Sequence, residues 1–262
     1  MINQALDERG VLRLTLNRPD KRNALDDEMV IALIDHLTSA ATDDRVRAVL
    51  LDAEGDNFCG GADLVARNAP RIEKPRVGSI QRRVPTQSGR LITQMLTAQV
   101  PIVCKVRGWA AGIGMQLALA SDFAIAADDA QFWEPFVRRG FTPDSGSTWL
   151  LPRRIGEVRA RELLMLDRVL SGDEAASWGL VHRAVPGGEL DAAVDDVLSK
   201  LVNGPTVALG LTKWLLNEGA QATLSQQLAN EAFALELSSR SEDFREGLAA
   251  MREKRAPEFG GL

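Results

Sequence analysis

The chain has 262 residues, of which 45% are hydrophobic and 26% are charged. This composition is that of a globular protein and argues against a disordered, collagen-like or coiled-coil chain. The formal net charge is −5 at pH 7. Since that balance suits a phosphate backbone poorly, nucleic acid is not expected as a partner.

Cysteine usage and the N-terminal residues favour a soluble, cytoplasmic protein. Two cysteines cannot form a disulfide framework, and two histidines leave little for a zinc site, so no metal is expected. Asp7 and Glu8 stand where a signal peptide would have an apolar run. No stretch reaches the roughly 18 apolar residues of a membrane span, so no membrane partner is expected.

The first part of the chain predicts a strand, a helix and a second strand. Residues 11–16 form a largely alternating apolar run that ends at a Pro-containing turn, and residues 47–51 form a short apolar run typical of a buried strand. A helix is expected between them, because acidic residues at 26–28 favour a helix N-terminus and apolar residues then recur every four positions. The predicted buried stripe consists of Met29, Leu33, Leu37 and Ala41.

The same theme recurs in the middle of the chain. Residues 101–106 predict a strand, an alanine-rich helix runs through residues 117–120, and residues 122–126 predict another strand. Strands that alternate with helices in this way indicate an α/β fold with mainly parallel strands.

From residue 157 onward the pattern predicts helices. Ser171 with Glu174, and Thr223 with Gln226, fit capping boxes. Two apolar stripes exceed what a terminal helix needs for folding onto its own subunit, so they predict self-association. The stripes consist of Leu224, Leu228, Ala232 and Leu235, and of Phe244, Leu248 and Met251.

Residues 67–90 are a basic segment that contains seven cations, one acid and three prolines. The absence of sustained periodicity predicts a solvated loop. The alternative is that some of these cations meet the phosphates of an anionic ligand.

Two turns rich in small residues, at 58–64 and 108–117, are the candidate sites of chemistry. Small residues let a ligand approach the backbone, and N–H groups at a helix start have no partner within the helix. Two such turns that face one point would form an oxyanion hole. Taken alone, each is simply a tight turn.

Taken together and in order, these motifs resemble the crotonase family of enoyl-CoA hydratases and isomerases. The likeness covers nearly the whole chain, with motifs at 16–19, 23–25, 58–64, 108–117, 130–132, 143–146, 170–172, 179–181 and 253–255. The resemblance implies an α/β, crotonase-type spiral of ββα turns with a helical C-terminal trimerisation region. The spiral core with the CoA and acyl site would span residues 1–200, and the helical region residues 201–262.

The resemblance also implies a site for an acyl-CoA thioester, whose coenzyme A is part of the substrate rather than a separate cofactor. The thioester oxygen would accept hydrogen bonds from the N–H groups of Ala62 and Ile113. Many members place a lysine at the position of Val65, and Arg22 or the basic segment could supply that charge. The expected substrate-binding and CoA-binding residues are Arg22, Ala24, Asp63, Leu64, Gln116, Trp133, Phe136, Phe141 and Lys254, the last from a neighbouring subunit of a homotrimer or hexamer.

Departures from the family pattern bear on the reaction. Hydratases of the family use two glutamates, and the matching positions here are Gln116 and Phe136, neither of which titrates usefully. Glu134 would replace a missing glutamate if an extended backbone through Pro135 placed it beside Phe136. We favour the alternative, a solvated or salt-bridged Glu134.

Asp144 is the remaining candidate acid/base. An aspartate before a helix is commonly an N-cap. Several isomerases of the family, such as the phenylacetate-pathway epoxyphenylacetyl-CoA isomerase, carry an aspartate in a similar Pro-Asp-x-Gly-x-Thr-Trp-Leu-Leu-Pro-Arg setting. One carboxylate suffices to move a double bond, so the resemblance predicts an isomerase. The alternatives are an enoyl-CoA hydratase, a CoA-ester hydrolase and a non-catalytic acyl-CoA-binding protein.

Overall fold

A computed structural model describes residues 1–64 and 76–262. Its main sheet has the strand order β1-β2-β3-β4-β6-β9 in the described part of the chain. The β1–β2 pair is an antiparallel hairpin, and the other neighbours run parallel. The strands are β1 (Ile2–Leu6), β2 (Val11–Leu16), β3 (Ala48–Ala53), β4 (Ile102–Val106), β6 (Phe123–Ala127) and β9 (Arg183–Val185). The predicted mainly parallel α/β arrangement is confirmed.

A smaller sheet stands beside the main one and has the order β5-β7-β8 among the described residues. It consists of β5 (Trp109–Ala111), β7 (Gln131–Trp133) and β8 (Val169–Ser171). β5 pairs with β7 in parallel and places Ala111 opposite Trp133, whereas β7 and β8 are antiparallel. This sheet therefore brings the second small-residue turn next to the segment after residue 133.

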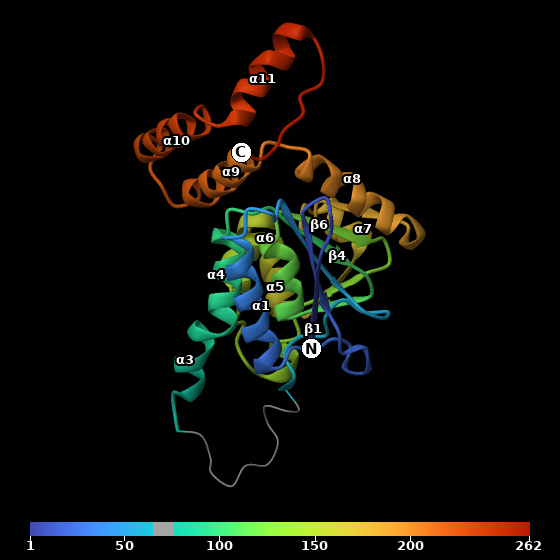
Figure 1. Cartoon of the computed structure of the whole chain (residues 1–262). Helices are drawn as coiled ribbons and strands as arrows, with labels where there is room; N and C mark the ends of the chain where they lie inside the picture. The colour runs from blue at the N-terminus through green and yellow to red at the C-terminus, as the bar shows by residue number, and fades with distance from the viewer. Residues whose placement is uncertain (65–75) are drawn as a thin grey trace.

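Helices cover both faces of the main sheet (Figure 1). Leu14, Leu51 and Leu117 meet in the core under α1, α4 and α5. Leu50, the neighbour of Leu51 on β3, faces α8 instead, as strand alternation requires. The helices here are α1 (Asp27–Ala40), α4 (Ser88–Thr97), α5 (Ile113–Ala120), α6 (Ser147–Leu166), α7 (Gly172–Ser177) and α8 (Leu190–Val202).

The stripe predicted for the first helix is correct except at its end. Met29, Leu33 and Leu37 are buried, and Asp26 caps the helix through its side chain. Ala41 is exposed because α1 ends at Ala40 and Ala41 is its C-cap residue. Ala40 takes the last buried position instead.

Two predictions about local structure are wrong. β8 and β9 lie within the region predicted to be helical, because three-residue strands are too short to show alternation. The described end of the basic segment is not a loop: it forms α3 (Ser79–Arg83), a 3-10 turn (Val84–Thr86) and the start of α4. Residues 65–75, including Val65 and the first cations of that segment, lie outside the described residues.

Of the two predicted capping boxes, the one at α7 is complete, whereas the described contacts at α10 form only half of one. Ser171 and Glu174 form a reciprocal capping box at α7. The hydroxyl of Thr223 accepts a hydrogen bond from the N–H of Gln226 at 3.3 Å and caps α10 (Leu224–Ser238). Short polar capping patterns therefore located two helix starts that the apolar pattern alone left open.

The last helices reach away from the sheets (Figure 1). They are α9 (Thr206–Gly219), α10 and α11 (Glu242–Glu253). Within one chain their predicted apolar stripes are largely exposed: Leu224 is 76% exposed, Leu228 55%, Leu235 66% and Met251 70%. The division of the chain at residue 200 stays a prediction.

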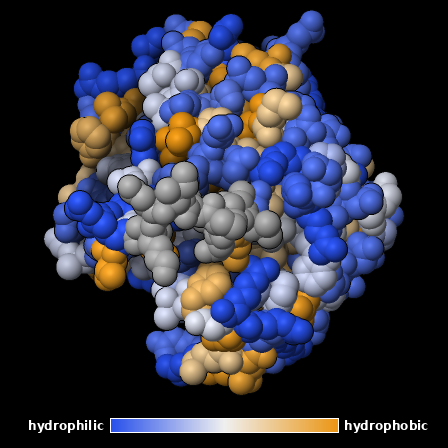
Figure 2. All heavy atoms as spheres, turned by 90° about the horizontal axis from the view of Figure 1, so that it is seen from below, coloured by the Kyte–Doolittle hydropathy of each residue, from blue (hydrophilic) through white to orange (hydrophobic). Residues whose placement is uncertain are grey.

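The underside of the molecule is mostly hydrophilic, with apolar side chains in small groups (Figure 2). No helix in the described ranges is both long and apolar enough to cross a membrane.

Candidate active site

The two small-residue turns lie against each other. The N–H of Cys59 donates to the carbonyl of Trp109 at 2.8 Å, and the N–H of Ala111 donates to the carbonyl of Cys59 at 2.9 Å. The packing is so close that a Cβ on Gly114 would lie 2.5 Å from the Cys59 carbonyl oxygen. Glycine is therefore required at position 114.

Each turn presents a backbone N–H that has no partner in the described structure. On either side of Ala62, Leu25 accepts a hydrogen bond from Asp63 and donates one to Gly61, both at 2.8 Å. The N–H of Ala62 itself donates to no described residue. Ile113 is the first residue of α5, and its N–H likewise meets no described acceptor. These are the two donors predicted for an oxyanion hole.

A cavity of about 590 Å³ opens beside the first turn. Four predicted residues line it: Ala24, Ala62, Asp63 and Leu64. Sequence reasoning assigned no ligand contact to the three cations that complete its lining, which are Arg18, Lys21 and Arg139.

The three cations of this cavity differ in their pairing. Arg18 is committed to ion pairs with Asp26 at 2.9 Å and Asp63 at 3.1 Å. Arg139 places its guanidinium carbon 5.8 Å from the centre of the Trp133 ring. Lys21 and Arg139 are exposed. The cavity therefore offers cationic groups beside an apolar backbone turn.

Arg22 lies next to this cavity in sequence, but its side chain is exposed and is not among those that line it. Its backbone adopts a left-handed conformation with φ 49°. Its carbonyl accepts a hydrogen bond from the N–H of Gly60 at 2.7 Å. Arg22 therefore holds the first turn through its backbone.

Glu134 is fully buried at the end of β7. The Gln116 side-chain N–H donates to Glu134 Oε1, and Ser147 Oγ lies 3.5 Å from Glu134 Oε2. Burial, reinforced by the negative charge of Asp144, raises the pKa of Glu134 well above its ordinary value. The prediction of a solvated or salt-bridged Glu134 is wrong.

The backbone after Glu134 also differs from the prediction. The N–H of Phe136 donates to the carbonyl of Glu134 at 2.9 Å, which makes a tight turn through Pro135 rather than an extended segment. Phe136 is 5% exposed and meets the ring of Phe141 edge-on at 5.5 Å. Phe136, packed on Phe141, therefore stands at the position that the family resemblance matched to a hydratase glutamate.

Asp144 is exposed in the loop before α6. Its carboxylate accepts a hydrogen bond from Ser145 Oγ at 2.7 Å. The N-cap of α6 is Gly146, which has no capping side chain, so Asp144 is not the N-cap. Ser147 holds the loop through its N–H and Oγ, which lie 3.1 Å and 2.9 Å from the carbonyl of Asp144.

Comparisons with known proteins agree with these features. The sequence matches the enoyl-CoA hydratase/isomerase family over residues 7–261. The chain belongs to this family. The 1,2-epoxyphenylacetyl-CoA isomerase of Escherichia coli K12 is 39% identical over 255 residues, which cover 97% of this chain and 96% of that protein.

Hydratases of the same family are also similar to this chain. The crotonyl-CoA hydratase of Syntrophomonas wolfei is 34% identical and covers 94% of this chain and 93% of its own. The crystal structure of enoyl-CoA hydratase from Bacillus anthracis superimposes with a TM-score of 0.92 and 30% identity, covering 100% of this chain and 99% of that one. The fold is thus of the crotonase type, and the relatives carry names from both reactions.

Of the nine predicted binding residues, Ala24, Asp63 and Leu64 line the cavity and the other six do not, Trp133 and Lys254 among them. Trp133 donates its indole N–H to Asp167 at 2.7 Å and packs on Trp109 at a ring distance of 5.8 Å. Lys254 is the C-cap residue of α11, which reaches away from the sheets (Figure 1), and it does not line the cavity. Within one chain, Lys254 is not brought to the cavity.

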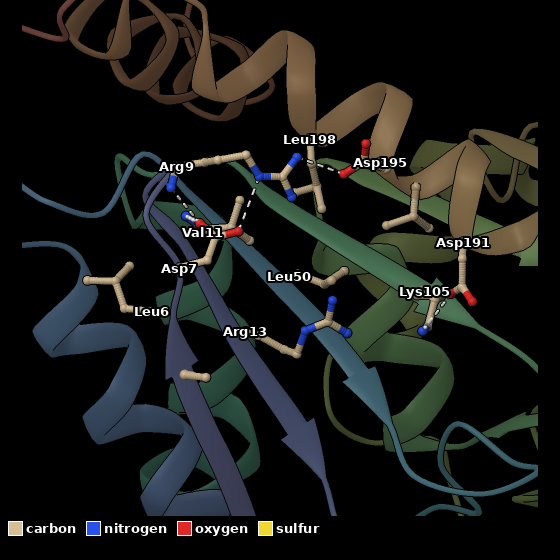
Figure 3. A pocket seen from close by; sticks show the side chains of 12 residues that line it. Leu6, Asp7, Arg9, Val11, Arg13, Leu50, Lys105, Asp191, Asp195 and Leu198 are labelled. Atoms are coloured by element: carbon tan, nitrogen blue, oxygen red, sulfur yellow. Dashed lines mark hydrogen bonds and ion pairs between the residues drawn. The ribbon is translucent and has the colours of Figure 1, made fainter.

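A second cavity, of about 430 Å³, lies between the β1–β2 hairpin and α8 (Figure 3). Its cations have carboxylate partners: Arg9 pairs with Asp195 at 2.8 Å, and Lys105 pairs with Asp191 at 3.0 Å. The Lys105 ammonium lowers the pKa of Asp191. Because its charges are already compensated, this cavity is a poorer site for the phosphates of coenzyme A than the one beside Ala62.

Proposed function

We propose that this chain is an isomerase that moves a double bond in an enoyl-CoA thioester, with Asp144 as the acid/base. The amides of Ala62 and Ile113 hold the thioester oxygen. The observation that carries the proposal is the contrast between an exposed carboxyl group at Asp144 and a buried one at Glu134, whose pKa desolvation raises.

The reaction needs one carboxylate. Asp144 removes the proton from the α-carbon of a 3-enoyl-CoA, and the electron pair moves into the thioester to give a dienolate. The two backbone N–H groups stabilise the negative oxygen. Asp144 then returns the proton to the γ-carbon, which leaves the double bond between the α- and β-carbons and regenerates the carboxylate.

Hydration is disfavoured by the same residues. Adding water needs a base for the water and an acid for the α-carbon. Gln116 and Phe136 replace the glutamates that would fill those roles, and the Glu134 side chain is already bonded to Gln116. Phe136 and Phe141 pack edge-on at a ring distance of 5.5 Å, and we propose that this apolar pair contacts the acyl chain.

The proposal extends to the assembly. We propose a cytoplasmic protein that assembles as a homotrimer or hexamer, in which neighbouring copies cover the exposed stripes of α10 and α11. Lys254 then reaches the coenzyme A of a neighbouring subunit. Within one subunit Lys21 and Arg139 supply positive charge for the phosphates. No metal or separate cofactor takes part in the proposed reaction.

A crystal soaked with a non-isomerisable acyl-CoA tests this proposal. We expect the thioester oxygen about 3 Å from the N–H groups of Ala62 and Ile113, with the α-carbon beside the Asp144 carboxylate. In solution the wild-type protein should convert 3-enoyl-CoA into the conjugated 2-enoyl-CoA. Tight binding without any conversion would instead identify a non-catalytic acyl-CoA-binding protein.

A further inference from the structure

Glu134 lies at the junction between the two halves of the proposed site. The carbonyl of Trp133, the residue before it, accepts a hydrogen bond from the N–H of Gly112 at 2.9 Å. Gln116, one helical turn after Ile113 on α5, binds Glu134 Oε1. On the other side stands Ser147, the first residue of α6. The Glu134 side chain therefore contacts both α5, which begins at Ile113, and α6, which follows Asp144.

The hydrogens available at this junction favour a protonated Glu134. Ser147 Oγ has one hydrogen to donate. The Oγ atom lies 2.9 Å from the Asp144 carbonyl oxygen but 3.5 Å from Glu134 Oε2. The shorter contact takes that hydrogen. Ser147 Oγ and Glu134 Oε2 then face each other with no hydrogen between them, unless Glu134 is protonated and supplies it. A carboxylic acid donates its O–H to Ser147 Oγ and still accepts from Gln116 through Oε1.

We propose that Glu134 is a positioning residue that works as a neutral carboxylic acid, linking Gln116 to Ser147 and so fixing the Asp144 loop relative to the oxyanion turn. This inference rests on the proposed function. It goes beyond that function by giving Glu134 a role: the Glu134 carboxyl group holds Asp144 in place and transfers no proton to the substrate.

The electrostatic setting supports the neutral form. Glu134 is 0% exposed, and desolvation is the main cause that raises its pKa. Asp144 is the charged group that acts on it among the described residues, and its negative charge raises the pKa of Glu134 further. The hydrogen bond that Gln116 donates to Glu134 opposes these effects, and so does the closeness of Ser147 Oγ.

Two variants separate positioning from proton transfer. Glu134→Gln keeps an acceptor for Gln116 and a donor for Ser147, so it should retain most of the turnover. Glu134→Ala removes both links and should lower kcat on the order of 10²-fold with little change in KM, since a displaced catalytic group costs rate rather than affinity. Glu157→Gln, on the exposed surface of α6, is the matched control and should behave as wild type.

The pH profile gives a second readout. As pH rises through the raised pKa of Glu134, wild type should lose turnover because the acid ionises and the link to Ser147 is lost. Glu134→Gln cannot ionise and should not show that decline. A Glu134→Gln variant that folds but is inactive would overturn the proposal in favour of proton transfer, and a fully active Glu134→Ala would overturn it altogether.

Infrared spectroscopy tests the neutral acid without any turnover. Wild type at neutral pH should show the carbonyl band of a buried protonated carboxyl group, which Glu134→Gln lacks and Glu157→Gln keeps. If wild type isomerises no thioester but shows the band, the proposed function fails while the protonation state stands. Absence of the band in an active wild type would overturn the neutral acid alone.

Discussion

Glu134 and Asp144 are ten positions apart in the sequence, yet they occupy opposite environments. Glu134 is fully buried, bonded to Gln116, and its pKa is raised by desolvation. Asp144 is exposed, and its carboxylate meets only the neighbouring Ser145 hydroxyl among its described hydrogen-bond partners. The difference teaches that environment, rather than proximity to the oxyanion turns, decides which carboxyl group is free to exchange a proton.

The largest effect is expected at Asp144. Asp144→Asn keeps the shape of the side chain but cannot accept a proton at neutral pH, so kcat for isomerisation should fall by about 10² to 10⁴. The affinity for coenzyme A, measured by calorimetry, should stay nearly unchanged. An Asp144→Asn variant with near wild-type turnover would move the acid/base role to the buried member of the pair.

The oxyanion turn gives the next largest effect, because the enolate that Asp144 forms must be held there. Ile113→Pro removes one N–H donor at the first position of α5, where a helix tolerates proline. Turnover should fall by about 10² to 10³. Ile113→Ala keeps the N–H and is the matched control. Equal turnover of the two variants would show that the Ile113 amide holds no negative charge.

The dependence of stability on pH should differ between wild type and Glu134→Gln. The pKa of Glu134 is raised in the folded state above its ordinary value of 4.5. Between these two values the unfolded chain releases the proton that the folded chain keeps, so wild type loses stability as pH rises, by up to about 1.4 kcal/mol per pH unit. Below the ordinary value this penalty is absent.

Glu134→Gln does not titrate, so urea unfolding should show its stability relative to wild type improving as pH rises above 4.5, the ordinary pKa of the group. Parallel stability curves for the two proteins would mean that Glu134 is already ionised in the folded state.

The smallest effect is expected at Gln116. Gln116→Ala removes a hydrogen bond to Glu134 but no titrating group, so turnover should fall by about ten-fold or less, the worth of about 1 kcal/mol. The amide oxygen of the same side chain, Gln116 Oε1, is buried and has no described partner. Measuring kcat of Gln116→Ala and Asp144→Asn side by side tests this ranking of the two residues. A larger loss of turnover in Gln116→Ala would contradict it.

The sequence predicted the larger elements because they carry strong apolar patterns. The runs at 11–16, 47–51, 101–106 and 122–126 became β2, β3, β4 and β6. β1 was missed since it is an exposed edge strand with polar residues, and β5, β7, β8 and β9 are too short to show a period. The family motif assigned Ala24, Ala62, Asp63 and Leu64 to one site, and the structure brings them to one cavity; their contacts with coenzyme A stay a prediction.

The environment of Glu134 could not be predicted in the same way. Its burial depends on Gln116 and Ser147, which come from two other elements and approach it only in three dimensions. The turn at Pro135 depends on a local hydrogen bond that the extended interpretation of this segment did not include. The position of Arg139 in the cavity beside Ala62 likewise arises from packing between distant segments.

The most direct test of the account follows two reactions of one enzyme preparation side by side: conversion of 3-enoyl-CoA to 2-enoyl-CoA, and hydration of 2-enoyl-CoA. Wild type should isomerise much faster than it hydrates, and Asp144→Asn should lose the isomerisation. Wild-type hydration that persists in Asp144→Asn and disappears in Glu134→Gln would contradict the account, because the buried carboxyl group would then be the one that moves protons.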